Sequence, residues 1–476
     1  MLYRVISKYG LATHLAFAAA IPAALTQFVS RDTLAATSLW FSLLAWLWIL
    51  LEPSVLAGET ISVARRRVLG GMLRDPIAWF FFIVVVFALV RWLNSGVAMV
   101  YDAENSIWSV RSPALALLPA SAGSAGFWPF AAAVAMATCV TGVRHALGRN
   151  ARIWFGLAAG AVSSTGAIAA TICAGVGMEP FVSSALAEIG AASFPGAMFA
   201  AFLPVSVLCG IDAEERGMNG ARLVFAWAVA GNAAGAYMFL PGMLGMAGLL
   251  LAGMVALAAF ILLKKRTNAA TTARAASLFS FGVLTAVFLV ILPPYEKIQA
   301  AKSNGLDSKN AFPPALESRN NALHRIAKTM WIDKPWTGVG VGAFGLHVPF
   351  LADKDDWSIL PPQPKDASNG YFTLIAESGI CGAMFWAIGI GMLLHFWISR
   401  LAGSVKWYRK QDEGRKWVLC IPMVAWVGPI VGCVCLADAW FSTDLPGTAL
   451  SICMVVAMSL AAASFPRLKR ETAKDE

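Results

Sequence analysis

Long apolar runs, separated by short polar segments, recur along the whole chain. A run of about 20 apolar residues is the length at which an α-helix crosses the hydrocarbon core of a bilayer. The pattern predicts twelve spans at 11–30, 34–52, 77–95, 125–143, 153–176, 194–211, 223–240, 242–263, 275–294, 376–396, 417–437 and 446–464. We therefore predict an all-α polytopic membrane protein, because a helix satisfies its own backbone hydrogen bonds in lipid.

Composition agrees with this pattern. Of the 476 residues, 58% are hydrophobic and only 13% are charged, whereas about a quarter of the residues in a soluble domain are charged. No small-residue cleavage site follows the first apolar run, so we expect that run to remain as the first span. The eight cysteines lie in or beside apolar segments without a zinc or redox spacing, which indicates small buried residues.

The positive charges indicate how the chain is threaded through the membrane. Lys and Arg gather in every second loop and at both ends of the chain, and such residues mark the cytoplasmic side of a membrane protein. The clusters include Arg65–Arg67, Arg144–Arg152, Lys264–Arg266, Arg409–Lys416 and Arg467–Lys469. Both termini are therefore predicted to be cytoplasmic. The net charge of +10 is a topology signal, so we do not expect a nucleic-acid partner.

Two of the predicted outward-facing loops are long, at 96–124 and 295–375. The second is near neutral, and its proline, tryptophan and glycine content indicates a folded cap. The predicted organisation is spans 1–9 in 1–294, an extracytoplasmic loop domain in 295–375, spans 10–12 in 376–464, and a cytoplasmic tail in 465–476. A large ordered loop is where function is expected.

Within the larger loop, residues 316–331 have the spacing of an amphipathic helix. The predicted buried face consists of Leu323, Ile326, Ala327 and Met330. Arg319 projects to the same side, where an unpaired charge is costly. It therefore needs either a carboxylate or a bound anion, and a planar guanidinium matches phosphate oxygens well.

Other polar residues of this loop project elsewhere. Arg325 and Lys328 lie on the opposite face of the predicted helix, where a solvated position is the simplest interpretation. His324 and His347 are the histidines expected on the outer side of the membrane. Each is either an ordinary exposed histidine or a general base that works near neutral pH.

The glycine-rich run GVGVGAFG covers residues 338–345. It lacks the preceding strand and the βα unit of a dinucleotide site. Its glycines, including Gly340 and Gly342, are interpreted as a tight turn or as a place where a substrate approaches the backbone. The nearby Asp353, Asp355 and Asp356 could bind a divalent cation, but they lack the rest of a calcium loop, which favours a solvated loop without a metal site.

The sequence DASNGYFTLIAESGICG, at 366–382, leads into the tenth predicted span. Asn369 is the expected N-cap of that helix, and Glu377 lies within its first turns. An acidic residue near a helix N-terminus is favoured by the helix dipole. An ionisable residue at the membrane boundary is also a candidate for function.

The order of these elements resembles the O-antigen ligase and O-antigen polymerase family of bacterial membrane glycosyltransferases. The resemblance rests on DKPWTGVGVGAF at 333–344, on SNGYFTLIAESGICG at 368–382, and on twelve spans with a large outer loop between spans nine and ten. The segment SFPGAMFAAFLPVSV at 193–207 also resembles a family element that precedes a span.

This resemblance implies a GT-C-like fold at the bacterial inner membrane. It implies transfer of a glycan from an undecaprenyl diphosphate carrier to a glycan or lipid acceptor on the outer face, without nucleotide sugar, metal or cofactor. Membrane lipid would surround the protein and hold the carrier's tail. Such a reaction needs cations to neutralise the leaving diphosphate, and a base or positioning group for the acceptor hydroxyl.

The sequence also departs from the family's pattern. Ser368 stands where the family has a histidine before the asparagine, and serine is no base at neutral pH. Family arginines are replaced near 188–192 and at 240–242. The candidates are His324, His347 and Glu377 for catalysis, Arg319, Arg325, Arg111 and Arg91 for diphosphate binding, and Asn369, Tyr371, Ser368, Gly340 and Gly342 for positioning.

Several functions fit these features. A polysaccharide polymerase fits better than a lipid A-core ligase, because polymerase motifs are looser. The alternatives are a protein O-oligosaccharyltransferase, a non-catalytic partner of a surface-glycan assembly complex, and a twelve-span transporter. A transporter would have two similar halves and charges deep in its spans, whereas this sequence has no internal repeat and spans nearly free of central charge.

Overall fold

The computed structural model describes residues 2–51, 60–175 and 199–239 with short gaps, and residues 314–409 with gaps at 361–363, 365 and 368–369. The predicted spans at 242–263, 275–294, 417–437 and 446–464 lie outside the described residues. So do most of the predicted span 194–211 and two candidate site residues, Ser368 and Asn369.

Within the described residues, five helical segments are long and apolar enough to cross a membrane. They are Thr33–Leu51, Pro76–Leu93, Phe127–Ala146, Asn150–Cys173 and Gly370–Gly389. Two shorter apolar segments are Gly10–Pro22 and Leu223–Gly235. These seven match the first five predicted spans, the seventh and the tenth. The described chain is thus that of a mostly helical, polytopic membrane protein.

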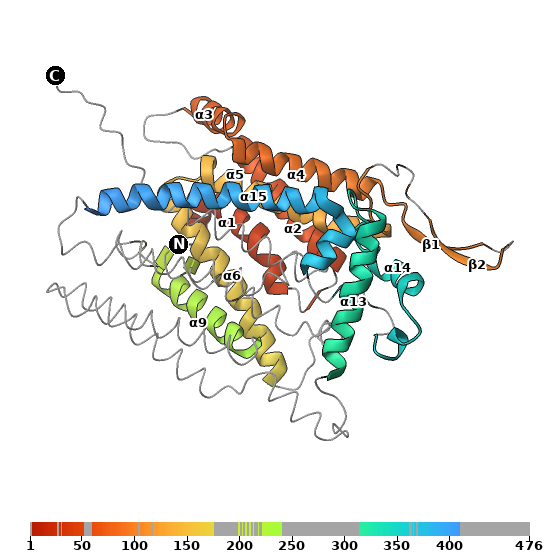
Figure 1. The fold of residues 1–476 in the computed structure, drawn as a ribbon. Helices are drawn as coiled ribbons and strands as arrows, with labels where there is room; N and C mark the ends of the chain where they lie inside the picture. The colour runs from red at the N-terminus through yellow and green to blue at the C-terminus, as the bar shows by residue number, and fades with distance from the viewer. Residues whose placement is uncertain are drawn as a thin grey trace.

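The spans form a bundle in which neighbours along the chain tend to lie side by side (Figure 1). The helices are α1 (Leu2–Leu25), α2 (Arg31–Leu51), α4 (Pro76–Leu93), α5 (Phe127–Thr141), α6 (Arg149–Gly175), α9 (Ala221–Phe239) and α15 (Gly370–Arg409). α1 packs on α2 and α6, α5 lies between α2 and α4, and α15 packs on α4. Their shared core is rich in alanine, which lets helices approach closely without a hydrophobic driving force.

Small and polar residues join α6 to α9. A Cβ at Gly231 would lie 1.9 Å from Ser164 Oγ, so the two helices nearly touch there. Ser163 Oγ donates to Asn232 Oδ1 at 2.8 Å, and Asn232 Nδ2 donates to the Gly160 carbonyl at 2.8 Å. Close approach at glycine and hydrogen bonds across the contact are the usual ways in which helices associate in lipid.

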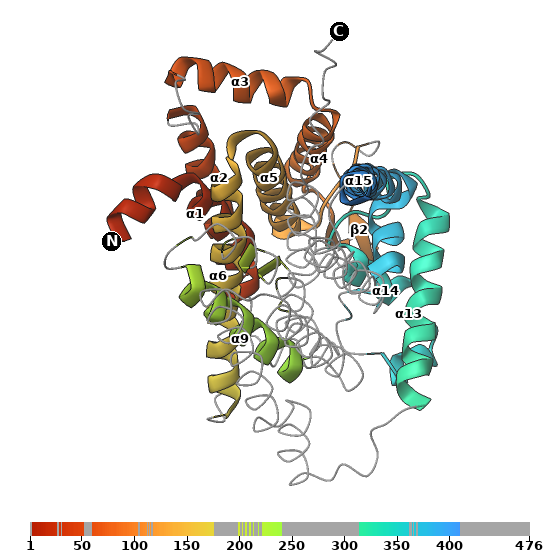
Figure 2. The same cartoon turned by 90° about the vertical axis from the view of Figure 1, so that its left-hand side faces the viewer.

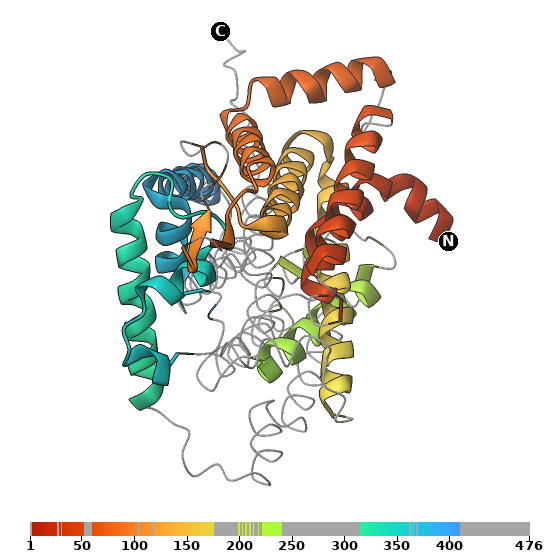
Figure 3. The same cartoon turned by 90° about the vertical axis from the view of Figure 1, so that its right-hand side faces the viewer.

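One end of the bundle carries α3 (Ile61–Leu73), a short helix that connects α2 to α4. Figure 2, which looks along the axis of α15, shows α3 lying across the ends of the spans, and Figure 3 shows the same from the other side. Below it, a turn of π-helix, η2 (Gly142–Ala146), continues α5. Hydropathy did not predict α3, because three consecutive arginines interrupt its apolar positions.

The opposite end carries a β-hairpin of strands β1 (Ala98–Asp102) and β2 (Ile107–Arg111) (Figure 1). Tyr101 lies opposite Trp108, with ring centroids 5.0 Å apart. The purely α-helical prediction is therefore wrong for the loop 96–124. Five-residue strands are too short for a hydropathy window of span length, and a cross-strand aromatic pair stabilises them locally.

The second long loop forms a helical cap at the same end as the hairpin (Figure 1). Its helices are α13 (Pro314–Asp333) and α14 (Phe344–Leu351). The predicted buried face of α13 is confirmed, since its four residues are at most 1% exposed. They form a second core with Val97 and Ala120 from the first loop, and with Val339, Phe344 and Ala376. The two loops predicted to face outward thus pack on each other.

Candidate functional site

The helix α15 is broken near its start, at Gly379, where φ is 62° and ψ is −165°. The break interrupts the hydrogen bonds of the helix, so backbone N–H and C=O groups on both sides of Gly379 need other partners within the protein. The N–H groups of Ile380 and Cys381 donate to the carbonyls of Pro335 and Trp336, at 2.8 and 3.2 Å. The segment that precedes the glycine run therefore caps the second part of α15.

The glycine run caps the first part of α15 in turn. Its Val339 and Gly340 N–H groups donate to the carbonyls of Ala376 and Glu377, at 2.9 and 3.1 Å. On its other side, the Val341 N–H donates to the Ala120 carbonyl at 2.9 Å. The cap, the loop 96–124 and the broken span are thus joined by backbone hydrogen bonds at one place.

This arrangement explains the glycines. Gly338, Gly340 and Gly342 have φ values of 68°, 108° and 71°, a region that side chains rarely adopt. A Cβ at Gly338 would lie 2.3 Å from the Glu377 backbone carbon, and one at Gly379 would lie 2.4 Å from that of Trp336. The interpretation as tight turns is confirmed, whereas substrate positioning by Gly340 and Gly342 stays a prediction.

Glu377 lies at the centre of this junction and is fully buried. Its Oε1 accepts hydrogen bonds from the N–H groups of Gly342 and Phe344, at 2.9 and 3.3 Å. Phe344 is the first residue of α14, so the carboxylate lies at a helix N-terminus, where negative charge is stabilised. Glu377 therefore holds the glycine run and α14 in place, whatever further role it has.

Arg91 approaches the same junction from the last turn of α4. Its Nη2 donates to Ser378 Oγ at 2.8 Å, and the Glu377 carboxylate attracts its charge. Its backbone carbonyl accepts from Ser121 Oγ at 3.0 Å. The Arg91 Nε is buried and has no hydrogen-bond partner among the described residues. A guanidinium with an unused donor, beside a fixed carboxylate, is suited to bind an anion.

Two candidate residues of α13 have different surroundings. Arg319 is half-buried, as its position beside the apolar face predicts, and its Nε has no hydrogen-bond partner within the described residues. The ring of His324 stacks on that of Phe372, with centroids 4.3 Å apart and planes 20° apart. His324 thus ties α13 to the first part of α15.

His347 is half-buried on α14. Its Nδ1 lies 3.0 Å from the Ala343 carbonyl, which favours a proton on Nδ1 and leaves Nε2 able to accept one. Burial lowers the pKa of His347 below its ordinary 6.5, and Lys334 adds to this, while the Ala343 carbonyl and Asp333 oppose it. The imidazole is therefore neutral at pH 7, which is the form a general base needs.

Arg325 is engaged by carboxylates. It forms an ion pair with Asp353 at 2.9 Å and another with Asp356. Asp356 is buried and also accepts from the Asp353 N–H at 2.8 Å. The expectation of a solvated loop is therefore wrong for Asp356, because Arg325 supplies the opposite charge that burial of a carboxylate requires.

The structure brings together four of the predicted site residues at the break in α15: Arg91, Glu377, Gly340 and Gly342. Arg111 lies exposed at the end of β2, and Tyr371 is largely exposed at the start of α15. Ser378 and Ser121, which hold Arg91, were not predicted. Only the break itself could have pointed to Ser378, because a serine beside a glycine is otherwise unremarkable in an apolar helix.

The fold and the junction define a class: a polytopic helical membrane protein with a partly buried arginine and a buried glutamate at one end of its spans, under a helical cap. A comparison with known families finds a match to part of the chain. The family model described as O-Antigen ligase matches residues 233–387, which include α13, α14 and Glu377. This match supports the resemblance to the O-antigen ligase and polymerase family that the motifs predicted.

The match also supports a role of the ligase or polymerase type in glycan transfer. Arg91, α4 and the loop 96–124 lie outside the matched residues. No curated protein and no solved structure matches the chain.

Proposed function

We propose that this protein transfers or polymerises a glycan carried on a polyprenyl diphosphate, at the outer face of the bacterial inner membrane. The acceptor is a hydroxyl group of a second glycan or of a lipid. The observation that carries the proposal is Arg91, whose charge lies beside Glu377 at the break in α15 and whose Nε has no hydrogen-bond partner among the described residues.

In the proposed reaction, the acceptor oxygen attacks the anomeric carbon of the donor sugar. The bond from that carbon to the diphosphate breaks, and its electron pair leaves with the diphosphate. Negative charge on the leaving group therefore grows during the reaction. A fixed guanidinium in a site that excludes water stabilises such charge far better than solvent does. Arg91 is fixed by Ser378 and is suited to this role.

The proton of the acceptor hydroxyl needs a destination. His347 is the histidine best suited, because it is neutral at pH 7 and its Nε2 can accept a proton. Glu377 is suited to positioning instead, since its Oε1 already accepts two backbone hydrogen bonds. Arg319, half-buried on α13, is a second candidate for the diphosphate.

A deletion strain complemented with variants tests the proposal. Arg91→Gln should abolish long surface glycan and cause the lipid-linked precursor to accumulate, whereas Arg91→Lys should keep part of the activity. The matched control is Lys328→Gln, which removes an exposed positive charge from α13 and should have no effect. Normal glycan from Arg91→Gln, at normal protein levels, would refute the assignment of Arg91.

A non-catalytic partner of a glycan assembly complex is the second candidate, because Ser368 stands where the family has a histidine. Purified protein with a lipid-linked oligosaccharide distinguishes the two. Longer glycan, released diphosphate carrier and loss of both in Arg91→Gln support the enzyme. A purified protein that makes no product, although it restores glycan in cells, supports the partner. Glycan attached to protein would indicate oligosaccharide transfer to protein.

A further inference from the structure

The helix α3 lies at the end of the bundle opposite the cap (Figure 1). Arg65, Arg66 and Arg74 are exposed. So are three apolar side chains, Ile61, Val63 and Leu73, which are 49%, 50% and 66% exposed. The helix itself carries no acidic residue. Its outer surface is therefore both strongly basic and apolar, which is unusual for a helix that faces only water.

The inner face of α3 is fixed to the bundle. Ala64 and Val68 are buried, and a Cβ at Gly71 would lie 2.9 Å from His145 Nδ1. Because Ala64, Val68 and Gly71 follow helical spacing, they form one face that sits on η2 and α4. The exposed arginines and apolar residues are thereby turned away from the protein.

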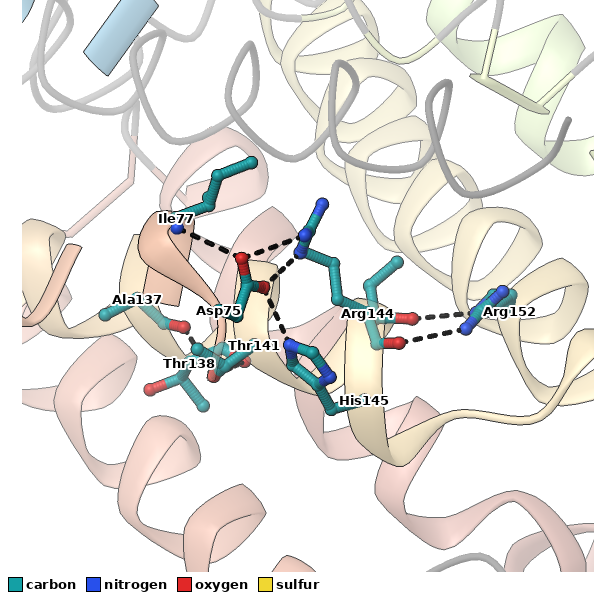
Figure 4. Close-up of polar contacts among 9 residues, drawn as sticks. Asp75, Ile77, Ala137, Thr138, Thr141, Arg144, His145 and Arg152 are labelled. Carbon is teal, nitrogen blue, oxygen red and sulfur yellow. Dashed lines mark hydrogen bonds and ion pairs between the residues drawn. The ribbon is translucent and has the colours of Figure 1, made fainter. Parts of the chain in front are cut away.

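A cluster of charges holds the turn from α3 into α4 (Figure 4). Asp75 accepts from the Ile77 N–H at 3.0 Å, from Arg144 Nε and Nη2 at 2.6 and 3.0 Å, and its Oδ2 lies 2.7 Å from His145 Nε2. Arg152 donates to the carbonyls of Val143 and Arg144, at 2.7 and 3.1 Å, so η2 is fixed as well. The crosswise orientation of α3 is thus imposed by the fold.

We propose that α3 is a membrane-surface helix that binds the headgroups of anionic phospholipids through Arg65, Arg66 and Arg74. In this position Ile61, Val63 and Leu73 enter the boundary between headgroups and acyl chains. A helix that lies in the membrane plane, with basic and apolar residues combined, has the composition of an interfacial helix. Arginine stems cover apolar surface while the guanidinium groups reach the phosphates.

The position of α3 favours lipid over a water-soluble acidic protein. α3 lies across the ends of the apolar helices (Figures 2 and 3), which is the level of the lipid headgroups when such helices cross a bilayer. Basic residues near the surface of an anionic leaflet attract its lipids within a Debye length. The proposal is independent of the glycan reaction, since it rests on the opposite end of the bundle.

Purified full-length protein in neutral lipid–detergent micelles provides the test. Adding phosphatidylglycerol should raise the thermal midpoint of unfolding, and Arg65→Gln with Arg66→Gln should remove about half of that rise. Replacing both by lysine should preserve it. The matched control, Lys328→Gln with Lys354→Gln, removes two exposed charges from the cap and should behave as wild type.

Two further measurements distinguish a lipid headgroup from a free phosphate as the bound anion. Soluble glycerol phosphate at the same concentration should not raise the midpoint, and an equal rise would indicate a site for a free phosphate instead. An unchanged response of the glutamine double variant would overturn the proposal. So would a wild-type midpoint that does not respond to phosphatidylglycerol, in which case an acidic protein partner becomes the better explanation for the exposed arginines.

Discussion

Glu377 and Gly342 are 35 residues apart in the chain, yet the Gly342 N–H donates to Glu377 Oε1 at 2.9 Å. The same oxygen accepts from the Phe344 N–H, so one buried carboxylate fixes the glycine run to the broken span. The cap and the tenth predicted span are therefore held together at the junction.

Two replacements of Glu377 distinguish the effect of its hydrogen bonds from the effect of its charge. Glu377→Ala leaves two backbone donors buried without an acceptor, at a cost of about 1–3 kcal/mol each. Glu377→Gln keeps an oxygen acceptor and removes only the charge. We expect the alanine variant to lose several degrees of thermal midpoint and the glutamine variant much less. Equal midpoints for the two variants, measured in detergent, would contradict this account of the junction.

The break in α15 makes Gly379 irreplaceable. Gly379→Ala places a Cβ 2.4 Å from the Trp336 backbone and forces a positive φ, so the cap must move. We expect a cost of about 1–3 kcal/mol and faster proteolysis of the 353–358 loop. Gly391→Ala in the same helix meets nothing within 4 Å. That control should be neutral, or stabilising by about 0.5–1 kcal/mol.

The pKa of His347 predicts how glycan transfer depends on pH. Its lowered pKa means that the neutral form is fully present above the ordinary value of 6.5. As the pH falls through the lowered pKa, the imidazole gains a proton, and both the stability that depends on the neutral ring and the proposed base function decline. The rate of purified protein should therefore fall on the acidic side, below pH 6.5.

The variant His347→Gln should be slow, and its remaining rate should no longer show this acidic decline. His395→Gln is the matched control, since His395 is exposed on the distant part of α15. It should keep both the rate and the decline. If the fall in rate at acidic pH persists unchanged in His347→Gln, a group other than His347 causes it.

Asp75 should stabilise the turn between α3 and α4. Burial favours its neutral form, but the hydrogen bonds from His145 and Arg144, with the charge of Arg144, lower its pKa from 3.8 to about 2. A depressed carboxyl pKa contributes stability that is present above pH 3.8 and is lost as the pH falls towards 2.

Asp75→Asn should accordingly cost roughly 2 kcal/mol at pH 7 and almost nothing near pH 2. Thermal midpoints of both proteins across that acidic range measure the difference. Asp355→Asn, at an exposed site of the cap, is the control and should follow the wild type. A constant difference between wild type and Asp75→Asn at all pH values would contradict the assignment of the pKa.

Much of the described structure could be predicted from local pattern. Seven of the predicted spans have helical counterparts, because about 20 apolar residues in lipid have no alternative to helix. The buried face of α13 followed from its spacing. The resemblance to the family rested on the glycine run and the residues before Gly382, and the family match to residues 233–387 supports it.

Other features were not accessible to local pattern. The β1–β2 hairpin and α3 are too short, and α3 too charged, to be detected by apolar runs. Pairing of Arg325 with Asp353 and Asp356 was also missed, because those partners are about 30 residues away along the chain and side chains at such separations are juxtaposed only by folding.

The sequence by itself thus determined a multi-span helical membrane protein and its resemblance to the O-antigen ligase and polymerase family. Tertiary structure alone decided which of the candidate residues meet. Arg91 and Ser378 are 287 positions apart, and their hydrogen bond exists because α4 packs on α15 where α15 is broken. At this junction Gly379 has a positive φ, and the Glu377 carboxylate accepts hydrogen bonds from two N–H groups that are distant in the sequence. Such long-range pairing leaves no periodic signal in the chain.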